Sequence, residues 1–180
     1  MAANSLRRLP TPTLETERFT LRKFVRGDAI ALWPTFSSDE HCRYLTRKAF
    51  ATIEELEGWF FDPEWDGRTW AAVDRSNGQI VARLVAVPVQ KDVSEIGYVT
   101  AHHRHGEGIA GECAARLVRF LFETEKHHRI TAGTDPRNTA SNALLERLGF
   151  RREGHLRQCV KTHLGWCDEY LWGLLASDGK

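Results

Sequence analysis

The run HRHGEGIAGE at positions 103–112 carries the strongest chemical signal of the sequence. Gly106, Gly108 and Gly111 form a G-x-G-x-x-G pattern directly before an apolar helical stretch. Closely spaced glycines let a backbone turn tightly and approach a ligand, and the first N–H groups of a helix have no partner within it. Such a helix start favours an anion. The pattern therefore predicts a phosphate-binding loop, without naming the molecule that carries the phosphate.

A dinucleotide fingerprint has the same glycine spacing, but its surroundings differ. It needs an apolar parallel strand that runs almost straight into the first glycine, within a series of strand–helix units. Here the preceding strand alternates polar and apolar residues, and the polar AHHRH separates it from Gly106. Asp135 resembles the expected ribose-binding acid, yet only about 45 residues follow it, too few for the second half of that fold. We therefore disfavour a nicotinamide- or flavin-dependent oxidoreductase.

Hydrophobic periodicity predicts the elements that must position the loop. The expected strands cover 18–24, 68–74, 80–89, 94–100, 129–135, 150–160 and 166–175. The expected helices are a short one after Asp28, one opened by a Thr52/Glu55 capping box, one over 109–125 and one from an Asn138 cap to Gly149. The Asn77-Gly78 pair predicts a hairpin between the second and third strands. We expect a single α/β (α+β) domain over residues 14–176, after a flexible lead-in at 1–13.

Bulk composition argues against several function classes, although a local basic patch stays possible. The chain has 180 residues, 42% of them hydrophobic, and its 25 basic and 24 acidic residues leave a net charge of +1. No global field favours nucleic acid or an anionic membrane, and the longest apolar run, IVARLVAVPV, is too short to span a bilayer. Four scattered cysteines lack any C-x-x-C spacing, and no metal-ligand grouping appears. We expect a cytoplasmic protein with reduced thiols and no bound metal.

Several linked motifs in a fixed order carry a family resemblance. They are EIGYVT at 95–100, HGEGIAGE at 105–112, N-x-x-S at 138–141, LERLGF at 145–150, REG at 152–154 and a final G-W-x-D-E-Y strand. Together they resemble the GNAT superfamily of acetyl-CoA-dependent N-acetyltransferases, and within it the subgroup that includes ribosomal-protein N-terminal (RimJ/RimL-like) acetyltransferases. The resemblance implies a mixed, mostly antiparallel twisted sheet of about seven strands flanked by about four helices.

The resemblance also implies a cofactor site. In that family a Q/R-x-x-G-x-G/A motif holds the CoA pyrophosphate, and residues 105–110 match it here, with His105 in place of the usual Gln or Arg. Because the loop binds mainly through main-chain N–H groups, this departure puts little in doubt. The residues expected to contact acetyl-CoA are Val99, Thr100, Arg104, His105, Gly106, Glu107, Gly108, Ile109, Ala110, Gly111, Asn138 and Ser141.

Three positions are implied to carry the chemistry. Glu95 resembles the family glutamate that deprotonates the amine, usually through water, although it could also be an exposed strand acid in an ion pair. The N–H of Val99 is expected to hold the thioester carbonyl. Many family members have a tyrosine that protonates the leaving sulfur where this chain has Leu145, so Ser141 is the natural substitute. That serine could equally bond back to its own helix.

The acceptor stays open at this point. The family resemblance implies direct acetyl transfer to a primary amine, which is either the N-terminal amine of a protein or a small amine such as an aminoglycoside, a polyamine or an amino-acid derivative. An acyl-enzyme on Cys113 is disfavoured because no histidine stands at an orienting spacing. The missing tyrosine leaves a second hypothesis, a non-catalytic acyl-CoA sensor or partner-binding module. A homodimer is plausible from the family, with no independent support in the sequence.

Overall fold

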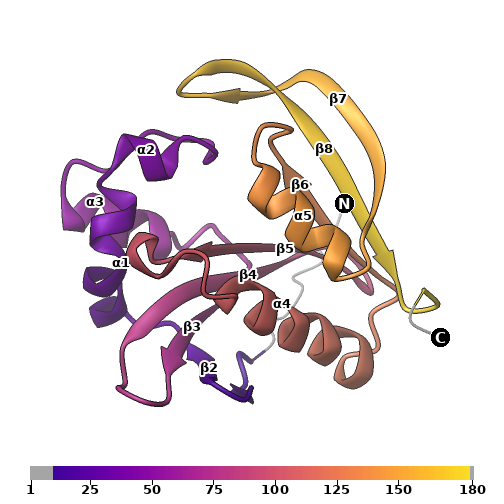
Figure 1. Cartoon of the computed structure of the whole chain (residues 1–180), viewed down its shortest axis with the longest axis horizontal. Helices are drawn as coiled ribbons and strands as arrows, with labels where there is room; N and C mark the ends of the chain where they lie inside the picture. The colour runs from indigo at the N-terminus through magenta and orange to yellow at the C-terminus, as the bar shows by residue number, and fades with distance from the viewer. Residues whose placement is uncertain (1–9, 179–180) are drawn as a thin grey trace.

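A single mixed sheet organises the computed structural model, which describes residues 10–178 (Figure 1). The strands are β1 Leu14–Glu15, β2 Phe19–Lys23, β3 Arg68–Asp74, β4 Ile80–Gln90, β5 Val93–Thr100, β6 Arg129–Thr134, β7 Arg151–Thr162 and β8 Gly165–Leu175. Their order in the sheet is β1-β2-β3-β4-β5-β6-β8-β7. Every neighbouring pair is antiparallel except β5 and β6, which are parallel.

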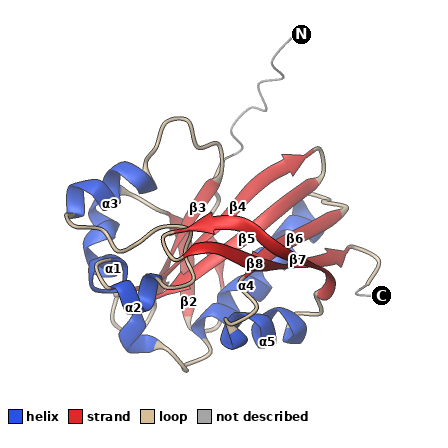
Figure 2. Ribbon diagram, turned by 90° about the horizontal axis from the view of Figure 1, so that it is seen from above, coloured by secondary structure: helices blue, strands red, loops and turns tan. Residues whose placement is uncertain are grey.

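Helices cover both faces of this sheet (Figure 2). They are α1 Ala29–Phe36, α2 Asp39–Cys42, α3 Ile53–Phe60, α4 Ile109–Arg119 and α5 Thr139–Arg147. A π-helical turn, Phe120–Thr124, continues α4. Helices α4 and α5 pack on one face, and α1 and α3 pack on the other. The two faces therefore have separate hydrophobic cores.

The predicted fold class is confirmed, with small differences in count. All seven expected strands are present, and the eighth is β1, whose two residues are too few to show a period. Helix α2 lies in a region where the sequence predicted nothing regular. The Asn77-Gly78 hairpin is confirmed, and Gly78 has a φ of +74° that suits glycine.

The expected lead-in falls partly on residues 1–9, outside the described part. Within the described part, the carbonyl of Pro10 accepts a hydrogen bond from Arg68, and that of Pro12 accepts one from Trp70. These bonds hold residues 10–12 against β3. The domain limits of 14 and 176 remain a prediction. Among the described residues, no helix is long and apolar enough to cross a membrane.

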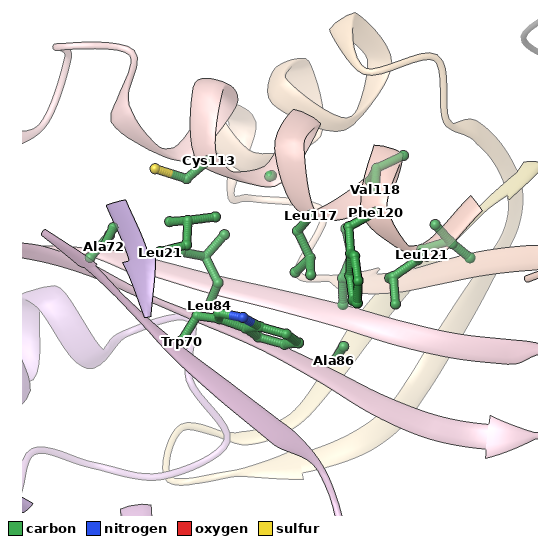
Figure 3. Packing of buried hydrophobic residues seen from close by; sticks show 14 of the residues in the cluster. Leu21, Trp70, Ala72, Leu84, Ala86, Cys113, Leu117, Val118, Phe120 and Leu121 are labelled. Atoms are coloured by element: carbon green, nitrogen blue, oxygen red, sulfur yellow. The ribbon is translucent and has the colours of Figure 1, made fainter. Parts of the chain in front are cut away.

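The core under α4 explains why the glycine loop is rigidly placed. Figure 3 shows Leu117, Phe120 and Leu121 of the helix facing Trp70 and Leu84 of the sheet. Apolar residues recur along α4 at spacings of three and four, so they form one stripe toward the sheet. Because this stripe fixes α4, it also fixes the helix N-terminus where the glycines lie.

The parallel pair β5–β6 holds together over a short length only. Its register runs Val93↔Arg129, Ser94↔Ile130 and Glu95↔Thr131, and it stops there although both strands continue. From Gly97 to Thr100, β5 pairs with β4 alone. The two strands therefore diverge after Glu95, which opens the middle of the sheet beside the glycine loop.

We expect Leu117→Ala to lower the free energy of unfolding by about 2–5 kcal/mol, because it removes a fully buried side chain and leaves a cavity between α4 and the sheet. Urea unfolding followed by circular dichroism measures the change. Val89→Ala is the control, since Val89 is 60% exposed and should change stability by less than about 0.5 kcal/mol. Equal losses in both variants would contradict the assigned packing.

Candidate active site

The glycine loop ends in an uncapped helix start. Gly106 and Gly108 have φ values of +84° and +76°, which side chains rarely adopt, whereas Gly111 has no such requirement. Gly108 is the N-cap of α4 and no side chain caps the helix. The first intrahelical bond is Glu112 N–H to the Gly108 carbonyl, so the N–H groups of residues 109–111 precede it. These groups can receive an anion, as the sequence predicted.

Arg104 forms two ion pairs that hold the glycine loop in place. The Arg104 guanidinium pairs with Asp74 at 3.0 Å and with Glu107 at 2.7 Å, and these bonds raise its pKa. The hydrogen bonds from Arg104 hold the pKa of Glu107 below its usual range. Arg104 thus neutralises a carboxylate in the loop, and its predicted contact with phosphate stays a prediction.

Sequence reasoning missed Arg18, which reaches the loop from the position just before β2. Its Nε donates to Glu112 at 2.7 Å, and its Nη1 donates to the carbonyl of Glu107 at 3.1 Å. A cavity of about 410 Å³ lies beside these groups, lined by Glu17, Arg18, Phe19, Asp74, Arg75, Ser76 and Arg104. Arg18 is separated from the loop by almost ninety positions, so no local pattern could have revealed it.

His105 contacts the strand that precedes the loop. Its Nε2 lies 3.1 Å from the carbonyl oxygen of Thr100, which is a hydrogen bond when this nitrogen carries the proton. The ring of His102 stacks on that of His41 from α2, with centroids 4.4 Å apart. Burial, followed by the neighbouring histidines, lowers the pKa of His102. These rings link α2 to the loop. Among the described residues, no group of histidine, cysteine and acidic side chains could hold a metal ion.

Glu95 lies at the last paired position before β5 and β6 diverge. Although the residue is solvent-accessible, the surrounding protein desolvates its carboxyl group and raises its pKa. Glu169 of β8 is a second carboxylate that sequence reasoning missed. Burial and the charge of Glu95 raise its pKa, and its carboxyl group fills the place of a Cβ on Gly133 of β6. Neither carboxylate forms an ion pair within residues 10–178, which argues against the ion-pair reading of Glu95.

The start of α5 lies close to β5, beside the opening between β5 and β6. Asn138 caps α5 by accepting a bond from the N–H of Ser141 at 3.2 Å. The hydroxyl of Tyr98 on β5 donates a long bond, 3.5 Å, to the carbonyl of Ser141, and burial raises the pKa of this tyrosine. Leu145, one turn further along α5, is fully buried in the core. The structure therefore brings the Tyr98 hydroxyl to the main chain of Ser141, while the position of the family tyrosine faces the core.

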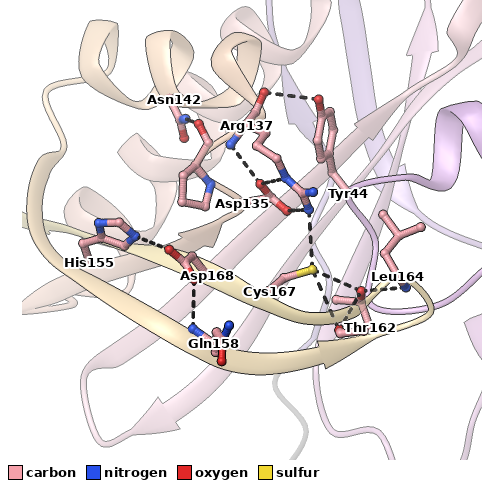
Figure 4. A network of polar contacts seen from close by, with 12 residues as sticks. Tyr44, Asp135, Arg137, Asn142, His155, Gln158, Thr162, Leu164, Cys167 and Asp168 are labelled. Carbon is pink, nitrogen blue, oxygen red and sulfur yellow. Dashed lines mark hydrogen bonds and ion pairs between the residues drawn. The ribbon is translucent and has the colours of Figure 1, made fainter.

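A polar network holds the turn before α5 (Figure 4). Arg137 pairs with Asp135 at 2.6 Å and donates to the sulfur of Cys167 at 3.4 Å, while its carbonyl accepts a bond from Tyr44. The network joins the segment after α2, the β6–α5 turn and the β7–β8 hairpin. It fixes the backbone next to Asn138. A cavity of about 230 Å³ borders it, lined by Asp135, Pro136, Arg137, Trp166, Cys167 and Asp168.

Cys113 is not placed for covalent catalysis. It is fully buried in α4, and burial raises the pKa of its thiol to about 12. A thiol in this state is protonated near neutral pH and is a weak nucleophile. The geometry thus favours direct transfer over an acyl-enzyme.

Comparison with known proteins shows to which family this chain belongs. The family model described as an acetyltransferase (GNAT) domain matches residues 18–151, which is most of the chain. The chain belongs to the GNAT family. It is 28% identical to the uncharacterized N-acetyltransferase p20 of Bacillus licheniformis over 91% of this chain and 96% of that protein. It is 31% identical to the uncharacterized N-acetyltransferase YoaA of Bacillus subtilis over 82% and 87% of the two chains.

Further similarities support the predicted subgroup and cosubstrate. The [ribosomal protein uS5]-alanine N-acetyltransferase of Escherichia coli is 32% identical over 46% of this chain and 43% of that protein. A GNAT-family acetyltransferase structure from Bacillus anthracis superposes with a TM-score of 0.85 at 27% identity, over 92% and 99% of the chains. The spermidine N-acetyltransferase of Vibrio cholerae, solved with CoA and spermine, has a TM-score of 0.78 at 21% identity, over 89% and 97%, and shares the fold.

This GNAT protein is an N-acetyltransferase that uses acetyl-CoA, and its own residues fit that cosubstrate. The two left-handed glycines, the three leading N–H groups of α4 and the diverging strands provide an anion cradle beside an open strand edge. The residue-level contacts predicted from the sequence remain predictions.

We expect Gly108→Ala to weaken acetyl-CoA binding by about tenfold or more, because a Cβ at this left-handed φ costs about 1–2 kcal/mol and shifts the N–H groups of the loop. Calorimetric titration with acetyl-CoA measures the loss. Gly78→Ala is a matched control with φ +74° in the β3–β4 turn. It should lose stability and keep its affinity, and a similar loss of affinity in both would refute a specific role for the loop.

Proposed function

We propose that this protein transfers the acetyl group of acetyl-CoA directly to a primary amine, either a protein N-terminal amine or the amine of a small molecule. The observation that carries the proposal is the position of Glu95, a desolvated carboxylate at the point where β5 and β6 diverge. Bound acetyl-CoA supplies the activated thioester. The chain must supply a base, a donor for the carbonyl oxygen and a proton for the departing sulfur.

Glu95 acts as the base. An amine must lose a proton to attack a carbonyl carbon, and a carboxylate with a raised pKa accepts that proton more readily, directly or through one water. Glu169 adds negative charge on the same face of the sheet, which favours the approach of a protonated amine.

The N–H of Val99, the donor predicted from the sequence, faces β4, because Ala101 two residues further on donates to Val81 and Val99 is paired with Arg83 in the same ladder. The N–H groups of Tyr98 and Thr100 face the open side of β5 and are the proposed donors to the carbonyl oxygen.

Ser141 is the proposed proton donor to the sulfur. It lies in the first turn of α5, capped by Asn138, and Tyr98 reaches the same turn from β5. A tyrosine with a raised pKa stays protonated across the neutral range, so Tyr98 can position this turn and is the second candidate donor. The names of the similar proteins include both a ribosomal-protein alanine and spermidine as acceptors, so they do not select one class.

Glu95→Gln should lower kcat/KM by about 10²–10⁴-fold, because the amide cannot accept a proton. In the unchanged protein kcat/KM should fall as the pH drops through the raised pKa of Glu95, above the value of about 4.3 for an ordinary glutamate. This acidic limb should vanish in Glu95→Gln. Release of CoA thiol during an amine screen measures the rates.

Glu54→Gln on the exposed side of α3 serves as the control and should keep both rate and pH profile. Acetyl-CoA affinity should stay unchanged in both variants. A non-catalytic sensor, the competing hypothesis, would bind acetyl-CoA and release no thiol with any amine. Full activity of Glu95→Gln would remove this residue from the mechanism.

Ser141→Ala should lower kcat by about 10²-fold or more, and Tyr98→Phe should lower it less, because the serine is the proposed donor and the tyrosine holds its turn. Steady-state kinetics at saturating acetyl-CoA compare the two. A larger loss of kcat in Tyr98→Phe than in Ser141→Ala, together with loss of the decline in kcat at high pH in Tyr98→Phe alone, would make Tyr98 the proton donor instead.

A further inference from the structure

Two glycines leave one face of the sheet without side chains at the point where β5 and β6 diverge. The last register pair of these parallel strands is Glu95↔Thr131, so Gly97 and Gly133 lie one step further along, level with each other. Both belong to the face of Glu95, opposite α4 and α5, because residues two apart in a strand share a face. Gly133 is exposed and Gly97 is half-buried. This glycine window is therefore open to solvent.

The carboxyl group of Glu169 reaches into the glycine window from β8. It occupies the place that a Cβ on Gly133 would take. Gly133 pairs with Leu171, and Glu169 is two residues from Leu171, so all three share one face. The φ of Gly133 is not positive, so its backbone does not require glycine. The missing side chain instead provides the space for the Glu169 carboxyl group.

No cation of the described chain neutralises the two carboxylates at the window. Neither Glu95 nor Glu169 forms an ion pair within residues 10–178. Burial, followed by the charge of Glu95, raises the pKa of Glu169, so the two groups are close enough to repel each other. Leu171 on the same face is 38% exposed. Two carboxylates beside an apolar side chain complement an ammonium group on a carbon chain.

The window also lies beside the expected position of the thioester. Gly97 directly precedes Tyr98, whose N–H faces the open side of β5 and is a proposed donor to the carbonyl oxygen. Glu95 lies about 10 Å from Tyr98 along the strand, whereas Glu169 reaches the level of Gly97, about 3.3 Å away. An amine over the window can therefore face the carbonyl carbon and still give its proton to Glu95, directly or through one water.

We propose that Glu169 binds the ammonium group of the acceptor over the glycine window and holds it there while Glu95 removes a proton. The proposal rests on the proposed function and narrows its acceptor to amines that are ammonium ions in neutral solution. Such an ion can belong to a small alkylamine or to the N-terminus of a peptide.

The proton balance of the transfer fits this arrangement. The ammonium group gives one proton to Glu95, and the nitrogen lone pair then attacks the carbonyl carbon of the thioester. As the C–N bond forms and the C–S bond breaks, the nitrogen loses a second proton and the sulfur takes one, so the reaction releases one proton in all. The product amide is neutral. The charge that bound the amine to Glu169 has therefore gone, and the product binds more weakly.

The test measures amine binding without turnover. n-Butylamine, spermidine and alanyl-alaninamide are each titrated calorimetrically into the protein saturated with CoA, beside their N-acetyl derivatives. At least one free amine should bind more tightly than its neutral derivative. Glu169→Gln should weaken this binding by about 10- to 100-fold, because a charge-assisted hydrogen bond is lost, while acetyl-CoA affinity stays constant. The probe that responds separates a small amine from a peptide N-terminus.

Gly133→Ala is an independent variant that keeps the charge of Glu169 and fills its place. The carboxyl group must leave the window, so amine affinity should fall, by less than in Glu169→Gln. Gly58→Ala on α3 is the matched control, because nothing lies near its added Cβ, and it should keep the amine affinity. Circular dichroism and thermal unfolding check that the variants are folded.

Steady-state kinetics with the bound amine distinguish the two glutamates. A raised KM for the amine in Glu169→Gln, with kcat changed far less than in Glu95→Gln, supports the binding role. Loss of kcat at unchanged KM would make Glu169 a second base and overturn the inference. Unchanged amine affinity and KM in Glu169→Gln, with activity lost in Glu95→Gln, also overturn it and leave the proposed function standing. Absence of both binding and turnover with every probe overturns both.

Discussion

The early end of the β5–β6 pairing is the constraint on which the rest of the site depends. Parallel strands normally continue to share hydrogen bonds along their length, but this pair stops at Glu95↔Thr131. Divergence leaves main-chain groups of β5 without a sheet partner on one side, and unpaired backbone groups in a protein interior require another partner. A linear cosubstrate that lies along the strand edge can meet this requirement. The sheet opens beside the uncapped N-terminus of α4, so the two proposed anchor points for acetyl-CoA, the strand edge and the glycine loop, are neighbours.

Packing on the two faces keeps this opening in place. The apolar stripe of α4 holds the loop from one side, and the Arg137 network holds the turn before α5 from the other. The loop itself is braced by Arg18 and Arg104, whose ion pairs take up carboxylates that would otherwise repel a phosphate. Rigid supports of this kind matter for acetyl transfer, since a small displacement of the reacting groups slows a reaction sharply.

Local sequence patterns predicted the helices, the strands and the glycine loop. They failed for residues that reach the site from distant positions in the sequence. Glycine spacing, the capping box at Thr52 and the Asn77-Gly78 turn act through neighbouring residues, so they can be read from the sequence directly. Arg18 and Glu169 reach the site across the fold and have no local signature. Strand β1 was missed because two residues cannot show a period, and helix α2 because its single turn follows from tertiary packing. Glu95 and Ser141 could be named as candidates only by family resemblance. Their proposed roles depend on the divergence of β5 and β6, which no local sequence pattern reveals.

Arg83 shows that the sequence also does not reveal which charged side chains become buried. In the sequence it interrupts an apolar run, IVARLVAVPV, which is typical of a strand with one face toward solvent. In the structure that face is covered by α3 and its aromatic residues, so the charge is buried instead of solvated. A sheet that needed only stability would favour an apolar residue of similar size at this position, because an unpaired buried cation adds no net stability. Cation–π contacts with Trp59 and Phe60 of α3 stabilise this charge in place of a carboxylate.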